Sequence, residues 1–133
     1  MKDTYIYPAV VDYSDESGIS VTFPDLPGCL PCAESTEEAV KNAKEALQLH
    51  LYGMEEDGEA IPGPTSVGSI KLGEHQTLFL TEVFMPPFRE KMRKRYVKKT
   101  LSIPAWLNAE AEHRGINFSQ VLQTALTEKL GLN

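Results

Sequence analysis

The residues in this chain whose type and spacing could do chemistry are, first, a dense run of cations. Seven lysines and arginines lie within eleven residues, and Glu90 is the only acid among them. They are Arg89, Lys91, Arg93, Lys94, Arg95, Lys98 and Lys99, and the other residues of this stretch besides Glu90 are uncharged. Positive charge at this density can bind the phosphates of a nucleic acid, but a run of like charges can also be a solvated linker. The residues that follow the run decide between these interpretations.

The end of the run overlaps a predicted β-strand. Residues 96–103 (YVKKTLSI) suit a pleated strand and are stopped by Pro104. Lys98, Thr100 and Ser102 alternate along one face of this strand. Paired with the same strand of a second copy, they form the basic, hydrogen-bonding face of a two-stranded ribbon. The major groove of DNA admits such a ribbon.

Two short helices are predicted after the strand. The first spans residues 104–114 and stops at Gly115, and the second begins at the N-cap Asn117 and closes at Gly131. A strand and two helices in about 38 residues cannot bury their own core, so we expect a dimer through this segment. The predicted dimer core consists of Leu101, Ile103, Phe118, Val121, Leu122 and Leu126.

Residues 98–104 (KKTLSIP) and 115–119 (GINFS) resemble the strand and the interhelical turn of the ribbon-helix-helix family of Arc, MetJ and CopG type. The resemblance implies these base contacts: Lys98, Thr100 and Ser102. The predicted phosphate contacts are Asn117, where a helix start offers free N–H groups, and Arg89, Arg93 and Arg95, which precede the ribbon. The alternative is a strand and helices that only pack on the N-terminal domain.

The N-terminal part differs in charge and in predicted structure. Residues 1–84 carry 4 Lys/Arg and 15 Asp/Glu, a net of −11, whereas residues 85–133 have a net of +5. This asymmetry indicates two units with different partners. We predict strands over residues 4–13, 18–23 and 76–83, and a short third strand around 29–33 whose Pro31 favours a sheet edge. A helix capped by Ser35 runs to the region between Gly53 and Gly58.

The expected fold class is therefore α+β, with a helix covering one face of the N-terminal sheet and a dimerising C-terminal ribbon-helix-helix. Pro86 and Pro87 are expected to close the first domain. The predicted organisation is a domain over residues 1–85, a basic linker over 86–95, and a DNA-binding and dimerisation domain over 96–133. The helix's apolar stripe is predicted to include Val40.

Residues 23–29 (FPDLPGC), 35–39 (STEEA) and 43–47 (AKEAL) strongly resemble the HicB antitoxin family. The resemblance implies a partial RNase H-like fold and a type II antitoxin that neutralises HicA, a small basic mRNA-cleaving toxin, and represses its own operon. A net of −11 suits such a partner. The candidate toxin contacts are Asp15, Glu16, Glu37, Glu38 and Glu45. The alternative is a solitary ribbon-helix-helix regulator, which a small basic reading frame beside the gene would disfavour.

An RNase H-like scaffold raises the question of metal-dependent nuclease chemistry. That chemistry needs converging carboxylates, and no motif makes the available acids converge: Asp12, Asp15, Glu16, Asp25, Glu34 and Glu38. We therefore expect no enzyme activity, no metal and no cofactor. Cys29 and Cys32 form a C-x-x-C without further zinc ligands and are expected to be thiols. The chain shows no signal-peptide core or membrane-length apolar run, so we expect a cytoplasmic protein.

Overall fold

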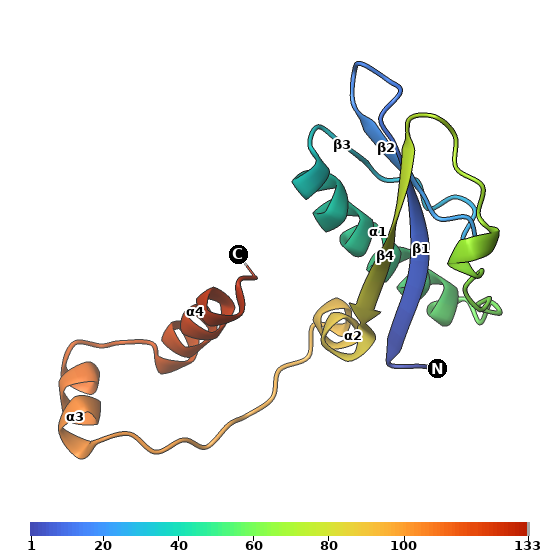
Figure 1. Ribbon diagram of the computed structural model, residues 1–133. Coiled ribbons are helices and arrows are strands. Elements are labelled where there is room, and N and C mark those ends of the chain that lie inside the picture. The colour runs from blue at the N-terminus through green and yellow to red at the C-terminus, as the bar shows by residue number, and fades with distance from the viewer. Residues whose placement is uncertain (133) are drawn as a thin grey trace. The chain divides into compact units, whose positions relative to one another are not determined.

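A computed structural model describes residues 1–132 and divides the chain into two compact units (Figure 1). Unit 1 is Met1–Arg95 and unit 2 is Tyr96–Asn133. Each is described by itself below. The boundary lies ten residues beyond the predicted end of the first domain, because a helix that the sequence analysis did not predict belongs to unit 1.

Unit 1 is built on a four-stranded sheet with the order β3-β2-β1-β4, in which every neighbouring pair is antiparallel. Its strands are β1 (Thr4–Asp12), β2 (Ile19–Thr22), β3 (Cys32–Ala33) and β4 (Gln76–Phe84). All four predicted strands are confirmed, and so is the edge position of the short one that follows Pro31. β4 forms the opposite edge. A short 3₁₀ helix, Val67–Ser69, lies in the loop before β4.

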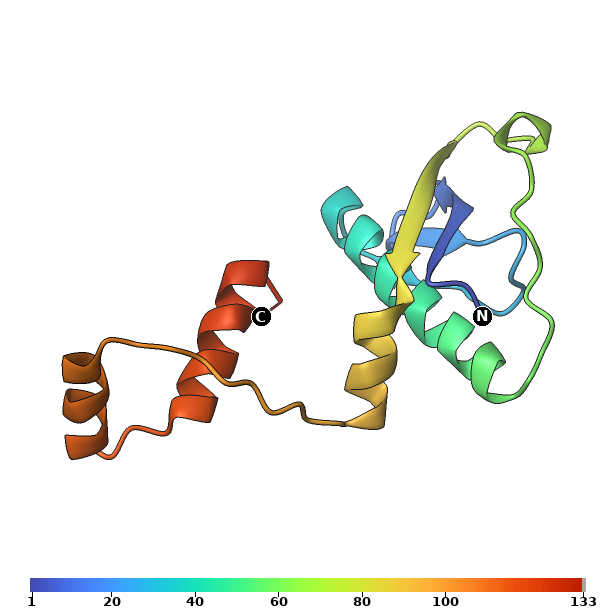
Figure 2. The same ribbon diagram turned by 90° about the horizontal axis from the view of Figure 1, so that it is seen from below.

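Helix α1 (Thr36–Glu56) covers one face of this sheet (Figures 1 and 2). The predicted cap is confirmed, because the Ser35 side chain accepts a hydrogen bond from the backbone N–H of Glu38 at 3.2 Å. The predicted apolar stripe is wrong at Val40, which is 50% exposed. The buried stripe instead repeats every four residues: Ala39, Ala43, Leu47 and Leu51. Its two alanines let the helix backbone approach the sheet closely.

Helix α2 (Met85–Arg93) occupies most of the segment that was predicted to be a basic linker, and that prediction is wrong. Pro86 and Pro87 lie in the first turn of α2, where the missing N–H groups have no helical partner to lose. Met85 is fully buried, and the Phe88 ring packs edge-to-face on Tyr52 of α1 with ring centroids 5.9 Å apart. The two prolines therefore begin a helix that is part of the domain.

Unit 2 contains helices α3 (Ala105–His113) and α4 (Phe118–Leu130), as the sequence predicted. The Asn117 side chain caps α4 by accepting a hydrogen bond from the Gln120 N–H at 3.1 Å. Residues 96–103 form no strand in the single chain, so the strand predicted there is not seen. Among the described residues, no helix is both long and apolar enough to span a bilayer.

Candidate nucleic-acid and protein interfaces

The three predicted base contacts of unit 2 are all exposed. Lys98, Thr100 and Ser102 lie in the segment that precedes α3, and none of them takes part in a hydrogen bond or ion pair within the described residues. Pro104 follows them and begins the first turn of α3. An extended segment with alternating exposed polar side chains can offer them to a groove as one row.

Unit 2 has no buried residue among those described, although it carries two helices with apolar side chains. Leu101 is 56% exposed and Val121 is 55% exposed. The other predicted core residues are exposed or half-buried: Ile103, Phe118, Leu122 and Leu126. A folded unit that leaves every apolar side chain partly in water has an unfilled core, and such a surface is typical of an obligate interface.

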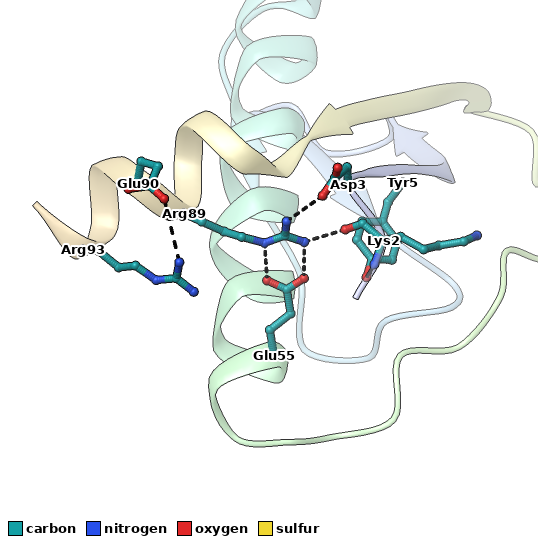
Figure 3. Close-up of polar contacts among 7 residues, drawn as sticks. All are labelled: Lys2, Asp3, Tyr5, Glu55, Arg89, Glu90 and Arg93. Carbon is teal, nitrogen blue, oxygen red and sulfur yellow. Dashed lines mark hydrogen bonds and ion pairs between the residues drawn. The ribbon is translucent and has the colours of Figure 1, made fainter. Parts of the chain in front are cut away.

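Arg89, predicted to contact phosphate, instead lies inside unit 1 and is only 7% exposed (Figure 3). Its Nε and Nη2 donate to the two carboxylate oxygens of Glu55, at 3.0 and 2.7 Å, and Nη1 donates to Asp3 Oδ1 at 3.0 Å. Nη2 also donates to the Lys2 carbonyl oxygen. These bonds to Glu55, the largest cause, raise the pKa of Arg89. Arg89 therefore cannot contact DNA without unfolding α2 from α1, and this prediction is wrong.

The two other predicted phosphate-contacting arginines are exposed but share one carboxylate. Arg95 Nε donates to Glu90 Oε2 at 2.7 Å, and Arg93 Nη1 lies 3.9 Å from Glu90 Oε1. The hydrogen bond with Arg95 lowers the pKa of Glu90 and raises that of Arg95. Exposed pairs of this kind are worth little, so a phosphate can replace the carboxylate at small cost.

The reassignment of α2 changes where the charge lies. Residues 1–95 carry 9 Lys/Arg and 16 Asp/Glu, a net of −7, and residues 96–133 carry 4 against 3, a net of +1. The basic run is therefore mostly the end of a helix anchored on the acidic unit. Unit 2 is nearly neutral and contributes only its exposed Lys98 and Lys99 to the run.

The candidate toxin contacts lie mostly at one end of unit 1. Asp15 and Glu16 are exposed in the β1–β2 turn, and Glu37 and Glu38 are exposed in the first turn of α1. The Tyr13 hydroxyl lies 3.0 Å from Thr36 Oγ1, which ties the hairpin to the start of α1. The fifth candidate, on the same helix, is also exposed and lies two turns further along: Glu45.

Two of the acids considered for nuclease chemistry, Asp12 and Asp25, accept hydrogen bonds within unit 1. Asp12 Oδ1 accepts from the Ser14 hydroxyl and N–H, and Oδ2 accepts from Gln76 Nε2 at 3.0 Å. These hydrogen bonds, with the Ser14 hydroxyl first, lower the pKa of Asp12 to about 2. Asp25 accepts from the Thr65 N–H at 3.0 Å. Among the described residues, no group of three or more His, Cys, Asp or Glu side chains could hold a metal ion.

Both cysteines are free, as predicted. Cys29 is buried in the core of unit 1, and this burial raises the pKa of its thiol to about 11. Cys32 is exposed in the edge strand β3. Because Cys29 is protonated at neutral pH and covered by neighbouring atoms, its place in the FPDLPGC segment is that of a small packing residue.

The sequence analysis missed the Arg89 cluster, although a signal for it was present. Arg89 lies four residues after Met85, so both fall on the buried side of α2, where Glu55 of α1 meets the arginine. Two adjacent prolines favour the end of a domain, but proline is also tolerated in the first turn of a helix, and here they lie in the first turn of α2.

The structure is thus that of a small two-unit protein. Unit 1 is acidic and has its own buried core, and unit 2 leaves its described apolar side chains exposed or half-buried. A model of the family described as "HicB_like antitoxin of bacterial toxin-antitoxin system" matches residues 7–125. The chain belongs to this family of HicB-like antitoxins.

Curated relatives match a little under half of this chain. Antitoxin HicB of Escherichia coli K12 is 36% identical over 63 residues, which are 47% of this chain and 46% of that protein. Antitoxin HicB 1 of Photorhabdus laumondii is 39% identical over 62 residues, 47% of this chain and 40% of that protein. An uncharacterized 14.9 kDa protein of Haemophilus phage HP1 is 40% identical over 57 residues, 43% and 42%. The chain thus spans less than half the length of these relatives.

Two solved structures cover nearly the whole chain. The antitoxin HicB of Burkholderia pseudomallei matches with a TM-score of 0.54 and 26% identity, over 96% of this chain and 98% of that one. A chain of a toxin-antitoxin complex from Streptococcus pneumoniae matches with a TM-score of 0.58, over 95% and 99%; at 22% identity this likeness concerns the fold.

Proposed function

We propose that this protein is the antitoxin of a type II toxin–antitoxin pair. Unit 1 binds and neutralises a small basic mRNA-cleaving toxin of HicA type, and unit 2 pairs with a second copy as a ribbon-helix-helix that binds operator DNA and represses the operon. Membership in the HicB-like family over residues 7–125 supports the antitoxin role. The partial RNase H-like character of unit 1 stays a prediction from the resemblance.

One observation carries the DNA-binding half of the proposal: no described residue of unit 2 is buried in the single chain. A second copy would cover Leu101 and Ile103 and would pair the two segments that contain Lys98, Thr100 and Ser102. Their exposed side chains would then form one row in a major groove. The cap residue Asn117 marks a helix start whose N–H groups suit a phosphate.

The antitoxin half is tested by co-expressing the full chain with the small basic reading frame beside its gene. We expect the antitoxin to relieve growth arrest and to co-purify with the toxin. A matched pair of variants locates the contact: Glu37→Gln with Glu38→Gln, against Glu56→Gln with Glu59→Gln. Each pair removes two exposed carboxylates from unit 1 and changes the net charge equally. Only the first pair lies at the end of unit 1 that bears the candidate contacts.

We expect the first pair to weaken toxin binding by about 1 kcal/mol or more and the second pair to have little effect. A carboxylate that contacts the toxin contributes to affinity only at the interface, whereas long-range attraction depends on the net charge, which both pairs change equally. Equal weakening by both pairs would show that only net charge matters and would remove these glutamates from the contact. If toxicity is unaffected by the wild-type chain, or if no toxin gene lies nearby, the solitary regulator replaces the antitoxin.

A further inference from the structure

β4 is an edge strand whose outer side is open. It pairs with β1 along its whole length, from Thr4↔Phe84 to Asp12↔Gln76, and among the described residues no strand pairs with its other side. β3 at the opposite edge is only two residues long, whereas β4 has nine. A long open edge presents a row of unpaired N–H and C=O groups that another strand can bind.

The hydrogen bonds of the sheet fix which residues of β4 face that edge. The Met85 N–H donates to the Asp3 carbonyl at 2.7 Å, and the Tyr13 N–H donates to the His75 carbonyl at 2.9 Å. Both pairs continue the β1–β4 register, so the hydrogen-bonded pairs of this ladder fall on odd-numbered residues. The even-numbered residues of β4 therefore direct their N–H and C=O groups to the open edge.

The same even-numbered residues carry their side chains on the sheet face that α1 does not cover. Odd-numbered pairs such as Val83 beside Tyr5 and Thr81 beside Tyr7 are buried in the core. On the uncovered face, Leu80 is 58% exposed and Phe84 is 55% exposed, and Ile6 of β1 beside them is 45% exposed. Exposed apolar side chains and unpaired backbone groups thus lie together along β4.

The charge of this edge fits a second copy of the chain better than a basic partner. β4 (QTLFLTEVF) contains one charged residue, Glu82, although unit 1 has a net of −7. It has no lysine or proline of the kind that protects exposed edges from pairing. A basic protein would be drawn to the acidic surfaces elsewhere on unit 1, whereas an almost neutral apolar strand can pair with its own copy without opposing like charges.

We propose that unit 1 self-associates through antiparallel pairing of β4 with β4 of a second copy, centred on Leu80. This register sets Leu80 opposite Leu80 of the other copy, Glu82 opposite Leu78, and Phe84 opposite Gln76. It joins outward-facing residues to outward-facing residues over the whole strand and keeps the two Glu82 carboxylates apart. The two sheets become one continuous sheet with both α1 helices on the same face. This interface is separate from the one proposed for unit 2.

The full chain tests this in four forms by sedimentation: wild type, Leu80→Pro, Leu101→Lys, and the double variant. Leu80→Pro removes an N–H that points away from β1 and leaves the β1–β4 ladder intact. We expect Leu101→Lys to remain dimeric through β4 and the double variant to be monomeric. A monomeric Leu101→Lys chain with an intact unit 1 overturns the β4 interface. A Leu80→Pro chain that is already monomeric keeps the β4 interface and overturns the dimer of unit 2 instead.

A charge exchange tests the register without altering the backbone. Leu80→Lys sets two like charges opposite each other at the centre of the β4–β4 interface, and so does Leu80→Glu. In the Leu101→Lys background we expect either change to weaken dimerisation about tenfold or more. Mixing the lysine and glutamate chains should restore the dimer, now as a heterodimer. The control Ile6→Lys lies on the same sheet face but not at the edge and should leave the dimer in place. If Ile6→Lys is equally disruptive, or mixing restores nothing, the proposed pairing is wrong.

The proposal is also wrong if Leu80→Pro abolishes co-purification with the toxin but leaves self-association unchanged. The edge of β4 would then bind the toxin and not a second copy of the chain.

Discussion

The two units of this chain solve the problem of burying apolar surface in opposite ways. Unit 1 fills its own core, where Tyr7, Phe23 and Leu47 are almost completely buried between the sheet and α1. Unit 2 contains well-capped helices but no buried residue in the single chain. Caps and helical periodicity can therefore define the helices of unit 2 even though packing within the single chain does not stabilise them. The difference teaches that unit 1 contains the apolar core it needs to fold, whereas we expect unit 2 to fold stably only with a second copy.

The largest expected effect comes from a charge in the unfilled core of unit 2. Leu101→Lys would place an unpaired ammonium in the apolar layer shared by two copies, and burying a charge without a partner is prohibitive. We expect complete loss of operator binding, together with loss of α-helical signal from unit 2, while unit 1 still melts cooperatively. Circular dichroism and a gel-shift titration measure the two outcomes. Operator binding that survives Leu101→Lys would mean that unit 2 does not use this face for pairing.

The second effect should fall on unit 1 alone. Arg89→Ala leaves the Glu55 carboxylate, whose side chain is 3% exposed, without its bidentate partner. Removing one partner of a buried ion pair costs about 3–5 kcal/mol. Urea unfolding of the full chain should show this loss in the transition of unit 1. The expected cause is the buried Glu55 carboxylate that has lost its partner. The double variant Arg89→Met with Glu55→Met also removes this carboxylate, so it should recover much of the stability.

The matched control for Arg89→Ala is Arg93→Ala on the same helix. The Arg93 side chain is 41% exposed and lies 3.9 Å from Glu90, so its removal should change stability by less than about 0.5 kcal/mol. For DNA binding we expect the opposite order: Arg93→Ala should have the larger effect and Arg89→Ala the smaller. Arg93→Ala should weaken operator and scrambled duplexes alike and reduce the salt dependence by about one unit per lost phosphate contact. Equal stability losses in the two variants would show that the buried pair is not what anchors α2.

How far the sequence predicted the molecule depends on whether a signal was local. The capped start of α1 at Ser35 and that of α4 at Asn117 were predictable because the capping side chain and the N–H that donates to it lie three residues apart. The spacing of Met85 and Arg89 could have placed Arg89 on the buried side of a helix, but its partners Asp3 and Glu55 lie far away in sequence and meet it only when the sheet and α1 assemble. The same reasoning put Val40 on the wrong side of α1. Ala39, one position earlier, is buried instead, because its small side chain lets α1 lie close to the sheet.

A smaller effect is expected from the hydroxyls that are proposed to read bases. Thr100→Ala and Ser102→Ala should each cost about 1–3 kcal/mol in operator binding and much less on a scrambled duplex, because base-edge hydrogen bonds discriminate and phosphate contacts do not. Neither change touches a contact within the single chain, so folding should be unaffected. Salt-titrated binding to both duplexes measures the difference. If the two duplexes lose affinity equally, the alternating face does not enter the groove.

The smallest effect concerns the point where unit 1 ends. Lys94 is the C-cap of α2 and has φ 55° and ψ 40°, the left-handed region, and it is the only described residue other than glycine with a positive φ. A side chain makes this conformation unfavourable by about 1 kcal/mol relative to glycine. We therefore expect Lys94→Gly to stabilise unit 1 by about 0.5–1 kcal/mol in urea unfolding.

Lys94→Ala removes the same positive charge but keeps the Cβ atom, so it separates backbone strain from electrostatics. If strain dominates, only the glycine variant gains stability, and it does so without any change in the Arg89 cluster that holds α2 on α1. If both variants gain equally, the lysine destabilises unit 1 through its charge beside Lys91 and Arg93, and the left-handed cap costs nothing measurable. A gain in stability for Lys94→Gly alone would show that unit 1 stays folded despite backbone strain at the end of α2, because its buried core stabilises it. Unit 2, which ends α3 and α4 with glycines nearby at Gly115 and Gly131, has no such reserve and avoids the strain altogether.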